Sequence, residues 1–134
     1  MIRLSNVSEE SIEEFDRKIK AIIQDATGKS MAYQNEIVQH GEDAHRMIKM
    51  GFEFTAKMLR AAISTGEPAI LDDQAKWAVS RLPHDKVSIS NLIRRLNRMK
   101  RTIRQILSKN ASKEIVPFVD YLIERIEEIK AQNR

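Results

Sequence analysis

The sequence contains no cysteine, which excludes a disulfide scaffold, a thiol nucleophile and a cofactor attached through a thioether. Its four glycines and three prolines among 134 residues favour long helices with short connections. No apolar run approaches the roughly 20 residues that a membrane-spanning helix needs, and the N-terminal segment has no signal-peptide core. We therefore expect one cytoplasmic domain over residues 1–134, with no membrane span.

Acidic residues are missing from a long segment in the second half of the chain, residues 86–113, although the net charge of the whole chain is only +4. This segment carries nine lysines and arginines. A basic segment of this kind can attract a nucleic acid, an anionic lipid surface or an acidic protein. The simpler interpretation is a solvated helix face balanced by the acidic residues of segment 9–16, and we favour it.

Apolar residues recur at spacings of three and four, the period of an α-helix, and no segment shows the alternation typical of a strand. The pattern predicts an all-α protein with five to seven helices. Serine, asparagine, glycine and proline mark the expected helix boundaries. In chain order we expect a helix capped by Asn6 or Ser8, two helices or one kinked helix between Ser30 and Ser64, a short helix after Gly66 and Pro68, a helix capped by Ser88 or Ser90, and a last helix that begins near Lys113 to Val116 with Pro117 in its first turn.

The triplet Gly28-Lys29-Ser30 ends like the phosphate-binding loop G-x-x-x-x-G-K-[ST], which follows a strand and precedes a helix. Ile23 stands where the first glycine of that loop belongs, and a helical pattern precedes the triplet in place of a strand. We therefore interpret Gly28 as the end of a helix and Ser30 as the cap of the next one. Nucleotide binding is not expected.

The histidines and serines do not form a recognisable metal, haem or catalytic site. Glu42 and His45 make one Glu-x-x-His pair, whereas ferritin-like metal centres need two such pairs and two more glutamates. His84 lies in a polar loop and His45 lies among charged residues, so neither resembles a haem ligand in an apolar pocket. No serine has the glycine-flanked turn that presents a nucleophile. We expect no enzymatic activity.

The basic helix 90–107 also raises the alternative of a helical DNA-binding transcriptional regulator. The connection between residues 83 and 89 is longer than the usual turn of a helix-turn-helix. The arginines also lack interleaved aromatic residues that would stack on bases. Arg94, Arg98 and Arg101 are therefore expected to face solvent and to meet an acidic partner protein, with no specific nucleic acid.

The middle of the chain resembles a known family. Four segments resemble globin-like sensor domains that have lost haem: Glu67-Pro-Ala-Ile-Leu-Asp-Asp-Gln74, Trp77-Ala-Val-Ser-Arg81 with the short loop after it, Val87-Ser-Ile-Ser90, and the helix through Met99-Lys100. Examples are the N-terminal domains of stressosome scaffold proteins and the sporulation-inhibitory sensor domains of bacilli. The same stretch is also similar to phycobiliproteins, but without cysteine no bilin can be linked by a thioether. Arg81 stands in place of the histidine of haem-binding sensor globins.

This resemblance covers about residues 44–106 and implies a globin-like, non-enzymatic signalling domain of a stress response. Relatives of this kind form homodimers and regulate a partner such as a signalling kinase, and some hold a fatty acid in a tunnel between helices. The resemblance thus implies a sensor with neither haem nor bilin.

Two groups of residues are the expected sites of this sensor. Apolar residues at both ends of the chain share one helix side at 3-4 spacing and are expected to form the dimer seam. Methionines and phenylalanines of one helix are expected to line a pocket for a fatty acid or another apolar ligand. The expected seam is Ile12, Phe15, Ile19, Val119, Leu122, Ile126 and Ile129; the expected pocket is Met47, Met50, Phe52, Phe54 and Met58, with Lys49, Lys57 or Arg60 as the carboxylate anchor.

Overall fold

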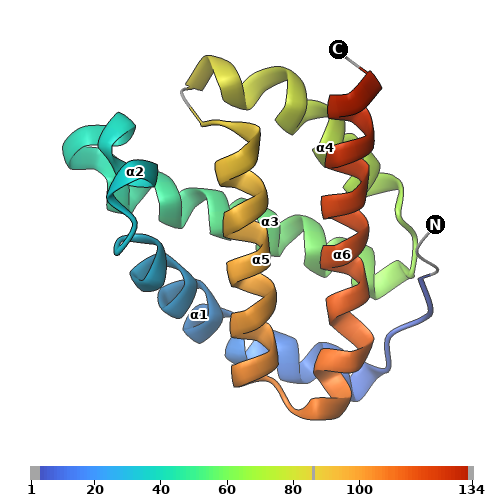
Figure 1. The fold of residues 1–134 in the computed structure, drawn as a ribbon. Helices are drawn as coiled ribbons and strands as arrows, with labels where there is room; N and C mark the ends of the chain where they lie inside the picture. The colour runs from blue at the N-terminus through green and yellow to red at the C-terminus, as the bar shows by residue number, and fades with distance from the viewer. Residues whose placement is uncertain (1–3, 86, 133–134) are drawn as a thin grey trace.

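The computed structural model describes residues 4–85 and 87–132, which form six α-helices and two short 3₁₀ helices (Figure 1). The expectation of an all-α domain with five to seven helices is confirmed. None of the described helices is long and apolar enough to cross a membrane. The elements are α1 (Glu9–Ser30), α2 (Gln34–Ile37), η1 (Val38–Asp43), α3 (Ala44–Thr65), α4 (Ala69–Arg81), η2 (Leu82–Asp85), α5 (Ile89–Ile106) and α6 (Lys109–Gln132).

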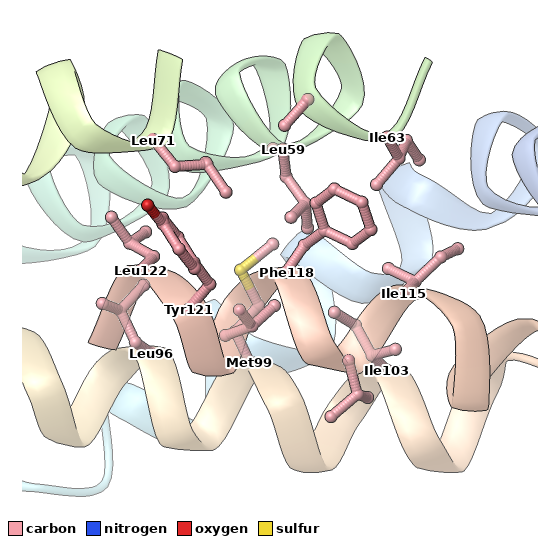
Figure 2. Packing of buried hydrophobic residues seen from close by; sticks show 14 of the residues in the cluster. Leu59, Ile63, Leu71, Leu96, Met99, Ile103, Ile115, Phe118, Tyr121 and Leu122 are labelled. Carbon is pink, nitrogen blue, oxygen red and sulfur yellow. The ribbon is translucent and has the colours of Figure 1, made fainter. Parts of the chain in front are cut away.

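Helices α5 and α6 run antiparallel side by side and pack across α1, α3 and α4 (Figure 1). The core lies between these layers. Figure 2 shows Leu59 of α3, Met99 of α5 and Phe118 of α6 converging there, and all three side chains are buried. The apolar residues that recur at 3-4 spacing on each helix supply this core, so the fold follows from the amphipathic pattern.

Side-chain caps fix the starts of α1 and α5. The Ser8 hydroxyl accepts a hydrogen bond from the Ser11 N–H at 3.3 Å, and the Ser88 hydroxyl accepts one from the Asn91 N–H at 3.1 Å. Each cap satisfies a backbone donor that has no partner inside the helix. Ser8 and Ser88 are each one of the two cap residues that the sequence predicted for these helices.

Two glycines interrupt the helical structure at positions where the backbone adopts a left-handed conformation. Gly66 ends α3 with a φ of 73°, as expected, and a Cβ at this position would lie 2.5 Å from the Oδ1 of Asn6. Gly41, with a φ of 59°, interrupts the chain inside η1. The segment between Ser30 and Ser64 is therefore broken before α3 and is not one continuous helix.

The prediction that Gly28 ends the first helix is wrong. Helix α1 continues through Gly28 to Ser30, whose buried hydroxyl donates to the Ala26 carbonyl at 2.8 Å. Glycine inside a helix costs only about 1 kcal/mol relative to alanine, which tertiary packing easily outweighs. The Gly28-Lys29-Ser30 triplet therefore belongs to a helix and is not a loop.

Helix α6 begins earlier than the sequence predicted. It starts at Lys109, after Ser108, whose hydroxyl accepts a hydrogen bond from the Ala111 N–H at 3.2 Å. Pro117 lies inside the helix and not in its first turn. The missing N–H leaves only the carbonyl of Lys113 without its helical partner, and this residue is exposed, so water can take that place.

The residues of the expected dimer seam are mostly covered by the chain itself. Phe15 of α1 and Leu122 of α6 are among the most deeply buried side chains. A 3-4 pattern shows that one helix face is apolar, but a neighbouring helix of the same chain covers such a face as well as a second chain does. Val119, Ile126 and Ile129 are buried, and Ile12 and Ile19 pack partly buried against the same core.

Candidate functional site

Three of the five residues expected to line an apolar pocket lie on the surface instead. Met47, Met50 and Phe54 of α3 are 37%, 53% and 40% exposed. Phe52 is buried in the core, and Met58 is partly buried against it. Residues 50, 52 and 54 are two positions apart, and on a helix such neighbours point to nearly opposite sides. The five residues therefore do not enclose one pocket.

The expected carboxylate anchors do not converge either. Lys49 and Lys57 are exposed on α3, and Arg60 is occupied by Asp16 of α1, with the Arg60 Nε 2.7 Å from the Asp16 Oδ1. The pocket assignment required that the anchors stand at the mouth of a cavity between the helices. Placing them correctly would have required knowing which face of α3 packs on α1.

The exposed side chains form an apolar stripe across two helices, which we define as Met47, Met50 and Phe54 of α3 with Trp77 of α4. Trp77 is 45% exposed. Its ring centroid lies 5.4 Å from that of Phe54, at an interplanar angle of 43°. This tilted contact is a favourable aromatic pair geometry. The stripe is a preformed apolar surface that the described part of the chain leaves uncovered.

A second unusual region, between α2 and α5, contains buried charges. This ionic cluster consists of Arg95 and Arg98 of α5 and Glu36 of α2. The Arg98 Nη2 lies 3.0 Å from the Glu36 Oε2, and the Arg95 Nε lies 3.6 Å from the Glu36 Oε1. The side chains of Arg98 and Glu36 are 5% and 1% exposed.

The burial of Arg98 corrects the expected arginine face. Arg94 and Arg101 are exposed as expected, and their role in meeting an acidic partner stays a prediction. Arg98, in contrast, is covered by the short α2, which brings Glu36 over this part of α5. The helical pattern showed that Arg98 lies opposite the apolar face, but not that another element covers it. A buried charge requires a partner of this kind.

The ionic cluster holds two guanidinium groups against one carboxylate. Burial lowers the pKa of Arg95, and Arg98 lowers it further, while Glu36 acts in the opposite direction. The Nε2 of His40 lies 3.4 Å from the Arg95 Nη2. Burial and, secondly, the charge of Arg95 lower the pKa of His40, which favours its neutral form. The cluster therefore carries an excess of positive charge.

A cavity of about 330 Å³ lies next to the ionic cluster, between the end of α1 and α5. The Arg98 guanidinium lies 4.2 Å from the centre of the Tyr33 ring. Sequence reasoning missed this cavity, because nothing in the spacing shows that the end of α1 meets the middle of α5. The lining residues are Lys29, Ala32, Tyr33, Arg98, Arg101 and Gln105.

This arrangement offers hydrogen-bond donors and positive charge, with no acid–base pair beside a nucleophile. Among the described residues, no group of three or more His, Asp or Glu side chains could hold a metal ion. The chemistry that the geometry supports is binding: of an apolar surface at the stripe, and of an anion at the cavity.

A family model described as phycobilisome protein matches residues 5–126, which is most of the chain. Comparisons with curated proteins and with solved structures found no match. The match extends far beyond residues 44–106 and confirms the globin-like fold and the absence of enzymatic function.

The same match overturns the assignment to haem-less sensor domains. A signalling and stress-response sensor, whether or not it regulates a kinase, is therefore wrong, and so is the alternative of a DNA-binding regulator. The assignment rested on a resemblance over about residues 44–106, whereas the family match spans residues 5–126.

The expected cofactors are corrected as well. Proteins of this family typically bind a bilin chromophore, so the exclusion of bilin in favour of a fatty acid is wrong. The argument from cysteine was too broad, because it excludes only the thioether bond and not a pigment held by other contacts. The residues of this chain do not fit a thioether-linked bilin, since no thiol is present.

Proposed function

The chain belongs to the phycobilisome protein family, and from this premise we propose that it is a subunit of a light-harvesting assembly. The family match over residues 5–126 carries this proposal. Phycobiliproteins are non-enzymatic and act as oligomers, so the surface that contacts another chain is the functional site to identify. The cytoplasmic location expected from the sequence is part of the same proposal.

The apolar stripe is the proposed contact surface, and its proposed occupant is a second copy of this chain. The terminal apolar faces are already buried within the chain, which leaves the stripe as the candidate. Tryptophan and its aromatic neighbours commonly dominate the binding energy of an interface. A fully buried aromatic side chain removes roughly 150–250 Å² from water. Phe54 and Trp77 are 40% and 45% exposed, so a contact would bury less than half of that area on each.

The charges beside the stripe support a twofold arrangement. Glu53 and Lys57 are exposed on α3 and lie one helical turn apart, next to Met50 and Phe54. A twofold axis places the same surface of each copy against the other, so residue pairs occur twice. Two copies related in this way can bring Glu53 of one copy to Lys57 of the other, which gives the apolar contact a polar rim.

Sedimentation velocity at tens of micromolar tests the contact. Trp77→Glu should convert the dimer to a monomer, because a charge enclosed in an apolar contact is costly. Val38→Glu is the matched control, since Val38 is also an exposed apolar residue, 68% exposed, but lies on η1 outside the stripe. A wild-type monomer, or an equal effect of both variants, would contradict a homodimer at this surface.

Association with phycobilisomes tests the larger proposal separately. Tagged protein recovered from its native cells should bring phycobiliproteins with it, and Trp77→Glu should reduce that recovery. If the wild-type protein is monomeric but still recovers phycobiliproteins through Trp77, the stripe contacts a different chain of the family. Recovery without any phycobiliprotein would contradict the light-harvesting role.

A bilin in this chain would be held by non-covalent contacts alone, because the sequence offers no thiol. Bilin taken up by the native protein should therefore separate from the polypeptide in a denaturing gel. A fluorescent bilin band that migrates with the denatured chain would contradict this expectation.

A further inference from the structure

The cavity between α1 and α5 is lined by positive charge that the described residues neutralise only in part. Lys29 meets Asp25, with the Lys29 Nζ 2.7 Å from the Asp25 Oδ2. Arg98 meets Glu36 in the ionic cluster. Arg101 has no carboxylate partner within the described part of the chain and is exposed beside the cavity. No carboxylate lines the cavity itself.

The buried arginines behind the cavity carry more positive charge than their carboxylate partner neutralises. Arg95 and Arg98 share the single carboxylate of Glu36. The Nε atoms of both arginines are buried and have no hydrogen-bond partner among the described protein atoms. These Nε atoms have almost no exposed surface, and Arg95 does not line the cavity, so a ligand there would not contact them. An anion in the cavity would act on the two arginines through its charge alone.

The number of charges indicates what kind of anion fits. Three cations, Lys29, Arg98 and Arg101, line the cavity. Asp25 pairs with Lys29 and Glu36 pairs with Arg98, but neither carboxylate lines the cavity. A phosphate group carries nearly two negative charges at neutral pH. The planar fork of N–H donors on arginine matches phosphate oxygens, and a lysine adds a compact point charge.

The neutral lining residues are compatible with the same ligand. The Gln105 Oε1 accepts a hydrogen bond from the Lys29 Nζ at 2.7 Å, which leaves the amide NH₂ as a donor. The C-terminal end of α1 contributes a negative partial charge, which the cations have to outweigh. A cavity of about 330 Å³ accommodates a phosphate group or a small molecule that carries one.

We propose that the cavity lined by Lys29, Arg98, Arg101 and Gln105 binds a phosphate group, either as inorganic phosphate or on a small phosphorylated molecule. This site differs from a phosphate-binding loop, because Lys29 acts through its side chain from a helix and no backbone loop surrounds the ligand. The site does not depend on the apolar stripe or on the proposed assembly.

Calorimetric titration with inorganic phosphate tests the site, with ionic strength held constant by sodium chloride. Saturable binding is expected, and Arg101→Gln should weaken it about tenfold because a charged hydrogen bond is lost. Arg94→Gln is the matched control, since Arg94 is an exposed arginine of the same helix that does not line the cavity. Both positions are exposed, so neither variant should impair folding.

Two results would overturn the proposal: phosphate heat that chloride reproduces at equal ionic strength, or equal weakening by Arg101→Gln and Arg94→Gln. A second titration with glycerol phosphate distinguishes the source of the phosphate group. Tighter binding of the ester would indicate a phosphorylated small molecule, whereas equal affinities would indicate that the phosphate group alone is recognised.

Discussion

The ionic cluster and the apolar stripe reverse the usual distribution of polarity in opposite ways. At the cluster, Arg95, Arg98 and Glu36 are charged and buried. At the stripe, Phe54 and Trp77 are aromatic and exposed. In the first region the short α2 covers a polar helix face, whereas in the second no described element covers an apolar one. In each region the burial of the side chains differs from what the helical pattern predicts. The cause is the presence or absence of another element packed on that helix face.

The largest effect is expected at the ionic cluster. Glu36→Ala leaves two buried guanidinium groups without their carboxylate, and this should lower the free energy of unfolding by about 3–5 kcal/mol. Urea denaturation measures the change. Glu13→Ala, on the exposed surface of α1, is the control and should change stability by less than about 0.5 kcal/mol. If both variants are equally stable, the cluster does not depend on its carboxylate.

A substitution at Leu122 tests whether a residue can stabilise the core without contributing to dimerisation. Leu122→Ala creates a cavity in the core and should lower the free energy of unfolding by about 2–5 kcal/mol. The folded fraction of this variant should dimerise as the wild type does, because Leu122 is buried within its own chain. Loss of the dimer in the folded variant would instead restore the terminal helices as the contact surface.

A substitution at Trp77 should affect dimerisation more than the stability of the monomer. Trp77→Ala is expected to weaken dimerisation by about 2 kcal/mol or more, as truncation of a central aromatic residue does. Its stability as a monomer should fall by less than that of Leu122→Ala, because the Trp77 side chain is nearly half exposed. Sedimentation and urea denaturation of the same sample measure the two quantities. A large loss of monomer stability would mean that Trp77 supports the fold more than the contact.

The smallest effect is expected from His40 at the edge of the ionic cluster. Because its pKa is lowered in the folded protein, the unfolded chain binds the proton first, and stability should fall as pH drops below about 6.5. The change should stay below about 1 kcal/mol, since the partly buried ring is screened by solvent. His40→Gln should reduce the pH dependence between about pH 6.5 and 5. His84→Gln, at an exposed position of η2, is the control, and an identical reduction there would contradict the assignment to His40.

The pH range in which His40 affects stability is separate from the range in which the carboxylates affect it. Hydrogen bonds from Ser108 and Ser11 are the largest causes that lower the pKa values of Glu14 and Glu114, respectively. The stability that these two groups contribute is present above their ordinary pKa near 4.5 and is lost as pH falls further. A fall in stability that begins only below about pH 4.5 would come from the carboxylates and not from His40.

Local signals in the sequence predicted several boundaries correctly. Ser8 and Ser88 can satisfy the backbone donors of the helix that follows them, and Gly66 can adopt a left-handed conformation, whatever the rest of the fold does. The predictions at Gly28 and Pro117 failed because each residue only disfavours a helix interior. Contacts with α5 and the core outweigh that cost, which is about 1 kcal/mol for glycine and about 3 kcal/mol for proline.

Periodicity and composition are properties of the chain, and from them an all-α domain with amphipathic helices and without a thiol for covalent attachment could be predicted. Which helix faces are covered depends on the tertiary structure. It buried Leu122 inside its own chain, exposed Phe54 beside Trp77, and enclosed Arg98 with Glu36 next to a cationic cavity. A helical pattern orients side chains around one axis only, whereas burial depends on which other element packs against each side, and that packing is set by contacts between distant parts of the chain.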